Sequence, residues 1–365
     1  MNQQTVQMQP EPALGRAPAV RAGVVGGSGY GGGELLRLLI GHPEVQITYV
    51  ASRTHAGEPL SRTHPSLLGY TDLVYGPLEL DAIAAHCNAL FIAAPHGAAM
   101  DLAAQALAAG LKVIDIGSDF RLPHAADYAT WYGLEHTQGH LLAEAVYGLC
   151  EWNRDRIAQA RLVSNPGCYP TSALLGLLPL LAAGLIEPDG IVVNALSGVS
   201  GAGSTPKPMY HFPERTENIQ AYGFVSHRHT PEIEAHLGGL ARRPVGPIQF
   251  SPHLVPMSRG IHATITARAA AGVDQEAVDQ AFHDRYATEP FVQVLTDGQF
   301  PQTKAVAGSN QCHLAARVDR RTGNVLVASV IDNLVKGAAG QAVQNLNLLF
   351  GLPETTGLMQ PPLFP

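Results

Sequence analysis

The sequence predicts an α/β protein of two domains, the first built on a parallel sheet and the second an α+β domain. The chain has 365 residues, which is more than one hydrophobic core usually serves. A strand, a glycine-rich turn and a helix open its ordered part, and strands then alternate with helices as in parallel sheets. After about residue 165 the strands follow one another with few helices between them, which indicates a mostly antiparallel or mixed sheet.

The spacing of apolar residues predicts the strands and helices of the first domain. Residues 22–25 form a short apolar run, residues 26–33 are rich in glycine, and residues 34–40 carry leucines at helical spacing. Apolar and polar side chains alternate over residues 45–51, as they do in a half-buried strand. Further apolar runs predict strands at 89–93 and 112–116, with an alanine-rich helix at 98–109.

The second domain begins with a helix predicted at 171–183, directly after a Pro-Gly-Cys turn. Strand-like runs then follow at 191–195, 248–255, 262–267 and 325–330. A last helix at 338–350 is expected to pack back on the first domain. The predicted domains are therefore 21–166 with 331–352, and 167–330, flanked by an extension at 1–20 and a tail at 353–365.

Composition and charge exclude several classes of protein. Apolar residues make up 46% of the chain and charged residues 15%, as in globular proteins. A net charge of −7 argues against nucleic acid or an anionic membrane as a partner. No apolar run is long enough to span a bilayer, and residues 1–20 lack the pattern of a signal peptide. Four cysteines without C-x-x-C spacing indicate neither a metal site nor a disulfide framework, so we expect a cytoplasmic protein without a metal.

The glycine turn predicts a dinucleotide site. Gly27, Gly29 and Gly32 match the G-x-G-x-x-G pattern between a strand and a helix, which is the context of Rossmann-type domains. Glycines let backbone N–H groups and the positive helix end approach a pyrophosphate. The alternative is a tight loop that only joins strand to helix. The residues expected at the cofactor here are Gly26, Ser28, Gly29, Tyr30, Gly31 and Gly32.

The end of the second strand indicates which cofactor binds. NAD-specific domains place a carboxylate there for the ribose 2′-hydroxyl. This chain has Ser52, Arg53 and Thr54 instead, and no carboxylate before Glu58. A guanidinium between two hydroxyls suits a 2′-phosphate, so the sequence favours NADP(H) over NAD. The alternative reading makes Arg53 an ordinary solvated arginine.

The turn NPGCYPT at 165–171 predicts a reactive cysteine. Pro166 and Gly167 form a turn, and Pro170 suits the first turn of a helix, so Cys168 is placed at a helix N-terminus. The helix dipole stabilises a thiolate there, and a thiolate is the nucleophilic form. The other cysteines, Cys87, Cys150 and Cys312, are interpreted as structural.

A thiolate nucleophile needs a proton-transfer partner, and the run HRHTPE at 227–232 offers one. His227 and His229 are the candidates for the acid or base, and the sequence leaves open which of them works on the cysteine. Arg228 lies between them and is suited to an anionic substrate. Glu232 is either a substrate contact, an orienting group for a histidine, or a helix-capping carboxylate.

Two further segments are interpreted as anion cradles. The small residues at 197–203, which include Ser200 and Gly201, would let the backbone approach a ligand. Arg121 follows a predicted strand, at the carboxyl edge where ligands of α/β domains bind. For both segments the alternative is a plain loop.

Taken together these motifs resemble the N-acetyl-γ-glutamyl-phosphate reductases (type 1) of arginine biosynthesis, within the aspartate-semialdehyde dehydrogenase superfamily. The resemblance runs from Arg21 to about Leu358 and is most specific in the cysteine turn and the HRHTPEI run. It implies that Cys168 attacks an acyl phosphate, releases inorganic phosphate and forms a thioester that NADPH reduces to a semialdehyde. It also implies that Asn333 lies near the nicotinamide. The residues that we expect at the substrate are Arg121, Asn165, Arg228 and Glu232.

The resemblance leaves two points open. Where the family often has a basic residue after Gly-Ala-Gly, this chain has Ser204, with Lys207 three residues later. The segments around 30–34 and 51–57 also resemble the sister reductase of lysine biosynthesis, which takes a carrier-linked aminoadipyl phosphate. Asn165-Pro166 and Tyr169-Pro170 favour the arginine-pathway substrate. The resemblance further implies a homo-oligomer, a dimer or tetramer, built through the second domain.

Two other classes of protein share part of these features. A Cys-His hydrolase or acyltransferase would not need the glycine turn and would work without NADPH. A non-catalytic nucleotide sensor would keep the glycine turn and tolerate loss of Cys168.

Overall fold

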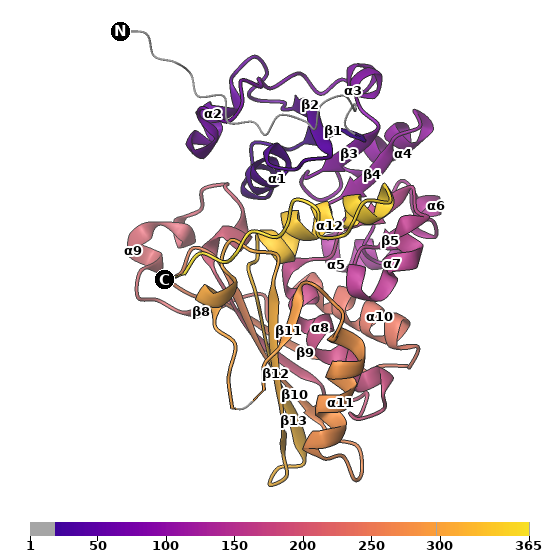
Figure 1. The fold of residues 1–365 in the computed structure, drawn as a ribbon, viewed down its shortest axis with the longest axis vertical. Helices are drawn as coiled ribbons and strands as arrows, with labels where there is room; N and C mark the ends of the chain where they lie inside the picture. The colour runs from indigo at the N-terminus through magenta and orange to yellow at the C-terminus, as the bar shows by residue number, and fades with distance from the viewer. Residues whose placement is uncertain (1–18, 297, 365) are drawn as a thin grey trace. The chain divides into compact units, whose positions relative to one another are not determined.

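The structure is a computed structural model that describes residues 19–296 and 298–364 (Figure 1). The chain forms two compact units. The first contains the residues up to Ala125, Glu135–Asn165 and Ala339–Met359, and the second contains Ala126–Leu134, Pro166–Ala338 and Gln360–Pro365. Most of the predicted N-terminal extension lies outside the described residues.

The first unit is built on a parallel sheet of six strands, in the order β2-β1-β3-β4-β6-β5. Its strands are β1 (Val20–Val25), β2 (Val45–Ala51), β3 (Ala89–Ile92), β4 (Lys112–Asp115), β5 (Val146–Tyr147) and β6 (Leu162–Ser164). This confirms the predicted Rossmann-type sheet. Because β1 has β2 on one side and β3 on the other, the chain changes direction across the sheet at β1, which is where α/β folds bind ligands.

Short helices connect the strands of this unit. They are α1 (Tyr30–Ile40), α2 (Leu60–Thr63), η1 (Pro65–Leu67), α3 (Leu80–His86), α4 (Met100–Ala108), α6 (Gly139–Leu142), α7 (Cys150–Ala158) and α12 (Gly340–Leu349). α12 packs on α1, α7 and β4, as predicted for the last helix. α1 begins four residues before its predicted start at Glu34, because Gly29 is extended and the glycines after it accept helical geometry.

The second unit is built on a mixed sheet of seven strands, in the order β11-β12-β13-β10-β7-β9-β8. Its strands are β7 (Val192–Ser197), β8 (Gln220–Ala221), β9 (Gln249–Leu254), β10 (Ile261–Arg268), β11 (Val292–Val294), β12 (Cys312–Asp319) and β13 (Asn324–Ile331). The pairs β7/β9 and β11/β12 are parallel and the other pairs are antiparallel. This confirms the α+β prediction.

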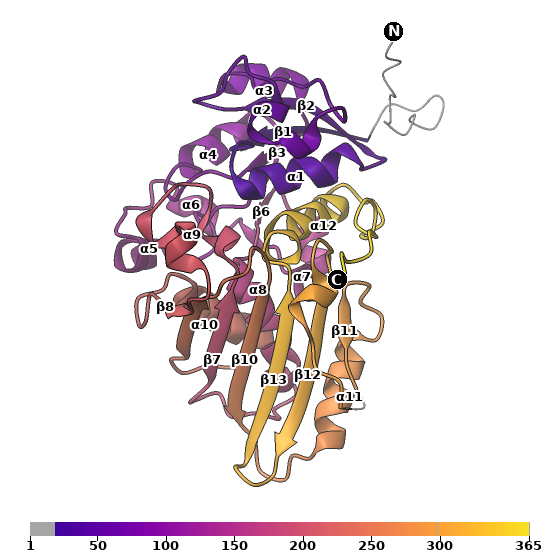
Figure 2. The ribbon, with the colours of Figure 1, turned by 90° about the vertical axis from the view of Figure 1, so that its left-hand side faces the viewer.

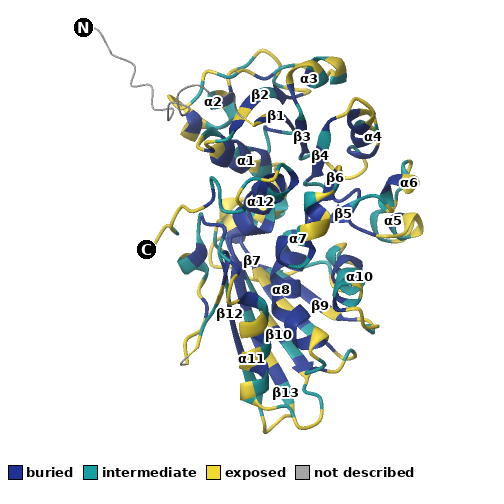
Figure 3. Cartoon of the chain, turned by 45° about the vertical axis from the view of Figure 1, so that its right-hand side comes forward, coloured by how far each residue is buried: buried dark blue, intermediate teal, exposed yellow. Residues whose placement is uncertain are grey.

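Helix α8 (Cys168–Ala182) is the centre of the second core. Its residues from Tyr169 to Leu181 are all buried, and Figure 3 draws the helix largely in dark blue. It packs on β10 and β13, and Gly176 permits this contact because a Cβ there would lie 3.2 Å from Ile265 and from Val327.

A proline interrupts the hydrogen bonding of α8. Pro179 has no N–H, so the carbonyl of Leu175 loses its helical donor. The hydroxyl of Tyr286 donates to that carbonyl at 2.7 Å. The carbonyl of Leu175 therefore keeps a hydrogen-bond donor inside the buried core.

Helices cover one face of the second sheet. α10 (His229–Ala241) and α11 (Gln275–Tyr286) flank α8. The remaining helical segments are α5 (Ala125–Tyr132), η2 (Val199–Ala202), η3 (Pro208–Tyr210), α9 (Phe212–Arg215), η4 (Thr303–Val306) and the π-helical turn η5 (Val335–Ala339). Figure 2 shows the opposite face, where β7, β10, β13 and β12 lie side by side and the long helices α8, α10 and α11 do not lie over them. The short segment η4 contacts β13.

Candidate active site

The glycine turn of the first unit forms a close backbone cradle. Gly26 follows β1 with a φ of +81°, and a Cβ there would lie 2.1 Å from the carbonyl oxygen of Ala93. A Cβ on Gly32 would lie 2.3 Å from the carbonyl oxygen of Gly26, so helix α1 can approach the turn only without a side chain. The ring of His64 fixes the turn, since its Nε2 lies 2.7 Å from the carbonyl oxygen of Gly27. Sequence reasoning missed His64, because a lone histidine carries no signal of its own.

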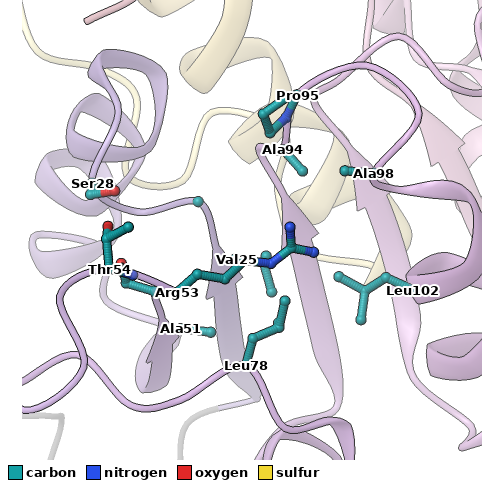
Figure 4. Close-up of a pocket in the computed structure, with 12 residues that line it drawn as sticks. Val25, Ser28, Ala51, Arg53, Thr54, Leu78, Ala94, Pro95, Ala98 and Leu102 are labelled. Carbon is teal, nitrogen blue, oxygen red and sulfur yellow. Dashed lines mark hydrogen bonds between the residues drawn. The ribbon is translucent and has the colours of Figure 1, made fainter. Parts of the chain in front are cut away.

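A pocket of about 260 Å³ opens beside this turn, at the carboxyl ends of the first strands. Figure 4 shows the side chain of Arg53 extended across it, with Ser28 and Thr54 at one side. The lining residues are Val25, Gly26, Ser28, Ala51, Ser52, Arg53, Thr54, Leu78, Ala94, Pro95, Ala98 and Leu102. Five of the predicted cofactor residues, Gly26, Ser28, Ser52, Arg53 and Thr54, thus share one cavity.

The other predicted cofactor residues of this unit lie at the start of α1. Gly29 is the residue before the helix and supplies no side-chain cap, which leaves the helix end open to an anion. Tyr30 is 49% exposed, and a Cβ on Gly31 would meet nothing within 4 Å. None of these three residues lines the pocket.

Ser52 and Arg53 have different environments. Ser52 is buried, and its hydroxyl accepts hydrogen bonds from the backbone N–H groups of Thr54 and His55 at 3.3 and 3.2 Å. Ser52 therefore stabilises the turn that contains Arg53 and Thr54. Arg53 is exposed and forms no ion pair with any described residue. Its charge is thus available to an anionic ligand.

Cys168 is the first residue of α8, three residues earlier than the predicted helix start. Gly167 precedes it in an extended conformation, and Cys168 is half-buried whereas the other three cysteines are buried. Gly337 approaches it closely, since a Cβ on Gly337 would lie 2.8 Å from the Cβ of Cys168. A cysteine at this position faces the positive end of a buried helix, which favours the thiolate.

Glu232 links the cysteine turn to the histidines. Its side chain is fully buried, and Oε1 accepts a hydrogen bond from the N–H of Gly167 at 2.7 Å. Its Oε2 lies 4.0 Å from Nε2 of His229. Both residues belong to the first turn of α10, where positions three apart face the same side. The carboxylate thus holds the turn before Cys168 and faces the His229 ring.

His227 occupies an aromatic enclosure. Its ring lies 5.7 Å from that of Tyr169, 5.5 Å from that of Tyr222 and 5.2 Å from that of Phe250. Burial, with a smaller contribution from the Arg228 charge, lowers the pKa of His227 to about 4. Its Nδ1 accepts the backbone N–H of His229 at 3.1 Å, so the neutral ring acts as a local support.

Two tyrosines complete the surroundings of Cys168. The hydroxyls of Tyr169 and Tyr222 lie 2.9 Å apart. Burial raises the pKa of both tyrosines well above the ordinary value, and the charge of Cys168 acts in the same direction. Both phenols therefore stay protonated and can donate. Neither tyrosine was predicted as a site residue, because aromatic side chains beside a turn are usually core residues.

The predicted substrate residues have separate environments. Arg228 is exposed at the start of α10, with its guanidinium 5.5 Å from the ring centre of Tyr132. Arg121 is buried and donates to the carbonyls of Asn165 and Ile116, both at 2.9 Å. Asn165 is buried as well, and its Oδ1 accepts a hydrogen bond from Asn345 at 3.0 Å.

Asn333 joins two loops of the second unit. Its Oδ1 accepts from the N–H of Gly260 at 2.7 Å, and its Nδ2 donates to the hydroxyl of Ser200 at 2.9 Å. A Cβ on Gly201 would lie 3.6 Å from Nδ2 of Asn333, so this glycine packs against the same amide. The three residues predicted at the cofactor, Ser200, Gly201 and Asn333, are thus brought together.

Comparison with known proteins identifies the family. A family model described as the NAD binding domain of semialdehyde dehydrogenase matches residues 21–160, and one described as the semialdehyde dehydrogenase dimerisation domain matches residues 168–333. The N-acetyl-gamma-glutamyl-phosphate reductase of Desulforudis audaxviator is 53% identical over 346 residues, which cover 95% of this chain and 100% of that protein. The chain belongs to the N-acetyl-γ-glutamyl-phosphate reductase family.

Other members of that family are similarly close. Proteins of this name from Acidithiobacillus ferrooxidans and Moorella thermoacetica are each 50% identical, again over 95% of this chain and their whole length. Among solved structures, aspartate semialdehyde dehydrogenase II from Vibrio cholerae has a TM-score of 0.70 at 20% identity, covering 90% of this chain and 98% of its own. The aspartate semialdehyde dehydrogenase with NADP from Candida albicans has a TM-score of 0.67 at 18% identity, with the same coverage. At this identity the two structures show a shared fold.

The described part of the chain holds neither a cluster of metal-ligating side chains nor a membrane-spanning helix. No three His, Cys, Asp or Glu residues within 19–296 and 298–364 are grouped as metal ligands would be. No helix in the same ranges is long and apolar enough to cross a membrane.

Proposed function

We propose that the protein catalyses the NADPH-dependent reductive dephosphorylation of N-acetyl-γ-glutamyl phosphate to N-acetylglutamate 5-semialdehyde, a reaction of arginine biosynthesis. The observation that carries this proposal is the placement of Cys168 at the N-terminus of a buried helix, with Glu232 between its turn and His229. Family membership at about 50% identity over nearly the whole chain supports the same reaction.

In the first half of the reaction the Cys168 thiolate attacks the acyl carbon. The carbon–sulfur bond forms, the bond from that carbon to the phosphate oxygen breaks, and phosphate leaves with the electron pair. The product on the enzyme is a thioester. The phenols of Tyr169 and Tyr222 are close enough to interact with the charge of Cys168, and burial keeps both protonated.

A nicotinamide cofactor suits the pocket of the first unit, because glycines at 26 and 32 let the turn and helix α1 pack closely and bring the N-terminus of α1 to the pocket, where a helix end favours a pyrophosphate. When bound, it supplies the hydride that reduces the thioester. Gly26, Ser28 and the N-terminus of α1 would hold its pyrophosphate. The exposed guanidinium of Arg53, which has no carboxylate partner among the described residues, would bind a 2′-phosphate, and this favours NADP(H).

His229 is the residue we assign to proton transfer. It faces the Glu232 carboxylate, which stabilises a positive imidazole, whereas His227 is enclosed by aromatic rings and its pKa is lowered to about 4. His229 therefore holds the proton that the carbonyl oxygen takes up and later returns. When the aldehyde forms, the carbon–sulfur bond breaks and Cys168 leaves as the thiolate.

The reverse reaction gives the direct test. N-acetylglutamate semialdehyde, inorganic phosphate and NADP are supplied, and NADPH is followed by absorbance. The wild-type protein is expected to reduce NADP only when phosphate is present, and Cys168→Ser should abolish this while NADP still binds. Cys87→Ala, at a buried cysteine of the first unit, is the control and should keep its activity. Substantial turnover by Cys168→Ser, or turnover without phosphate, would contradict the mechanism.

The carrier-linked aminoadipyl substrate is not favoured, since the relatives at about 50% identity bear the name of the N-acetylglutamyl enzyme. Assaying the aminoadipate analogue alongside separates the two substrates. We also propose a cytoplasmic location, because Cys168 attacks the substrate as a thiolate and a reducing compartment keeps thiols reduced.

A second copy of the chain is the partner we propose, with the open face of the second sheet as the contact. Leu196 on β7 and Leu326 on β13 are 37% and 39% exposed on that face. Alternate residues of β10, such as Thr264, point the same way, while their neighbours are buried in the core. The match of residues 168–333 to a dimerisation domain supports this assembly.

A further inference from the structure

The segment around Arg215 has the reverse of the usual distribution of side chains, with a charged residue buried and large apolar residues exposed. Between Val199 and His229 Arg215 is the one buried residue, with 6% of its surface exposed. Large apolar residues of the same segment lie outside, with Phe212 80% exposed and Ile219 62% exposed. A chain normally buries such apolar groups and leaves an arginine in water. The inward position of Arg215 therefore needs a cause other than hydrophobic packing.

The guanidinium of Arg215 lacks a counter-charge. Its Nη2 donates to the carbonyl of Glu214 at 3.0 Å and to Oε1 of Gln220 at 3.2 Å. Its Nε and Nη1 are buried and have no hydrogen-bond partner within residues 19–296 and 298–364. None of the described carboxylates forms an ion pair with it, and Glu214 and Glu217 beside it are exposed.

A buried cation in this condition is costly. Removing a charge from water is unfavourable by several kcal/mol unless an anion and hydrogen bonds compensate for the lost hydration. Two neutral acceptors on one nitrogen do not provide that compensation. Because Nε and Nη1 have no acceptor among the described residues, we expect an anion from another molecule to compensate for the charge.

The contact with Gln220 places Arg215 beside β8, the edge strand of the second sheet. Gln220, its partner on β8, pairs with Leu254 of β9, and Leu254 pairs with Ser197 of β7. Figure 2 shows α9 at the upper end of this sheet, near β8. Two residues beyond Gln220 is Tyr222, which hydrogen-bonds Tyr169 next to Cys168.

We propose that Arg215 binds the α-carboxylate of the substrate, the carboxylate that does not react. This rests on the proposed function, since N-acetyl-γ-glutamyl phosphate carries that carboxylate four carbon–carbon bonds from the reacting carbon. Gln220, which contacts Arg215, and Tyr222, which contacts Tyr169, are two residues apart, so their side chains lie on the same side of this extended segment. The phosphate is assigned to the Cys168 end because it leaves from the carbon that the thiolate attacks.

Arg215 thereby gives the site a basis for selecting its substrate. A substrate with the α-carboxylate satisfies the buried guanidinium, whereas one with a neutral group there leaves the cation uncompensated.

The kinetic test compares Arg215→Met, Arg215→Lys and Arg320→Met in the reverse assay. Arg320 is an exposed arginine of the same unit and serves as the matched control. Arg215→Met should raise the KM for the semialdehyde about 10- to 100-fold, as expected for loss of a hydrogen-bonded charge. The kcat and the KM values for NADP and phosphate should stay within about threefold, Arg215→Lys should be intermediate, and Arg320→Met should match the wild type.

A binding test without turnover uses two probes. N-acetylglutamine keeps the α-carboxylate, and N-acetylglutamine α-amide carries a carboxamide in its place and is otherwise identical. In thermal unfolding the first should stabilise the wild type more than the second, and Arg215→Met should lose this difference. The Met variant should itself be at least as stable as the wild type, because it removes an uncompensated buried charge.

The outcomes separate this proposal from the proposed function. An unchanged KM for the semialdehyde in Arg215→Met, or a rise only in the KM for phosphate, would overturn the carboxylate contact. So would a loss of oligomeric mass with unchanged KM, since the anion would then come from a second copy. If the wild type lacks turnover yet the Arg215-dependent preference for N-acetylglutamine remains, the carboxylate site stands and the proposed function is wrong.

Discussion

Replacing Glu232 by Gln is the sharpest test of how the second unit organises its nucleophile. Glutamine has nearly the same shape and can still accept the N–H of Gly167, the contact that Oε1 makes at 2.7 Å. It removes the negative charge that faces His229 across 4.0 Å. The substitution therefore keeps the hydrogen bond to Gly167 and removes only the electrostatic interaction with His229.

The size of the effect can be worked from this distance. Two unit charges 4.0 Å apart attract each other by about 4 kcal/mol at an effective dielectric constant of 20. The His229 side chain is 16% exposed, so water screens part of this energy. If about half of it is realised in the transition state, the loss is about 2 kcal/mol, or about 30-fold in kcat.

The assay is the phosphate-dependent reduction of NADP, with kcat and KM measured for each substrate. Glu232→Gln should lower kcat about 10- to 100-fold and leave the KM for NADP unchanged. Glu234→Gln on the same helix is the matched control, because Oε1 of Glu234 accepts the backbone N–H of Ile248 at 2.9 Å. The reasoning is refuted if Glu232→Gln keeps more than half of the wild-type kcat, or if Glu234→Gln loses as much.

Four further predictions follow from other parts of the structure. Arg53→Ala should weaken NADPH binding by about tenfold or more and NADH binding little, and equal losses in titrations would exclude a 2′-phosphate contact. Leu196→Lys should convert the oligomer to monomers in light scattering, because it places charge on the open sheet face; an unchanged mass would place the interface elsewhere. Since burial lowers the pKa of His227 to about 4, the unfolded chain binds the extra proton first, and wild-type stability should fall by up to about 3 kcal/mol as the pH drops from 6.5 to 4. In His227→Gln, chemical denaturation should show that pH dependence reduced. Tyr286→Phe should cost about 1–3 kcal/mol in chemical denaturation, because the buried carbonyl of Leu175 loses its donor, and a smaller loss would show that water replaces the hydroxyl.

Regular periodicity explains which elements the sequence predicts well. The strand at 45–51 was predicted with its observed bounds, and the long apolar helix after the cysteine turn was placed within three residues of its observed start. Strands β5, β6, β8 and β11 were not predicted, since two or three residues are too short to show alternation. β12 was missed for another reason, because Ala315 and Ala316 break its alternation.

The expected return of the chain to the first domain at 331 also needs adjustment. Residues 331–338 group with the second unit, and the first unit resumes at Ala339. The side chain of Asp332 accepts hydrogen bonds from the N–H groups of Gly308, Leu334 and Val335, and its main-chain carbonyl accepts one from Gly337, which ties this segment to its own unit. The bond from Gly308 spans 24 residues, so it leaves no local pattern in the sequence.

Local sequence was sufficient for the features that depend on neighbouring residues. The glycine turn, the position of Cys168 at a helix start and the absence of a carboxylate after β2 all follow from residues within a few positions of one another. Backbone conformation and helix ends depend on residues close together in the sequence, so these features can be predicted without the tertiary structure.

Tertiary structure determined the environments of the titrating groups. In the sequence His227 and His229 are equivalent candidates, and only packing encloses one ring among Tyr169, Tyr222 and Phe250 while the other faces Glu232. Arg215, which carries no motif, becomes notable only through its burial. Charge state depends on the solvent and on partners that are distant in the chain, and those are determined by the fold.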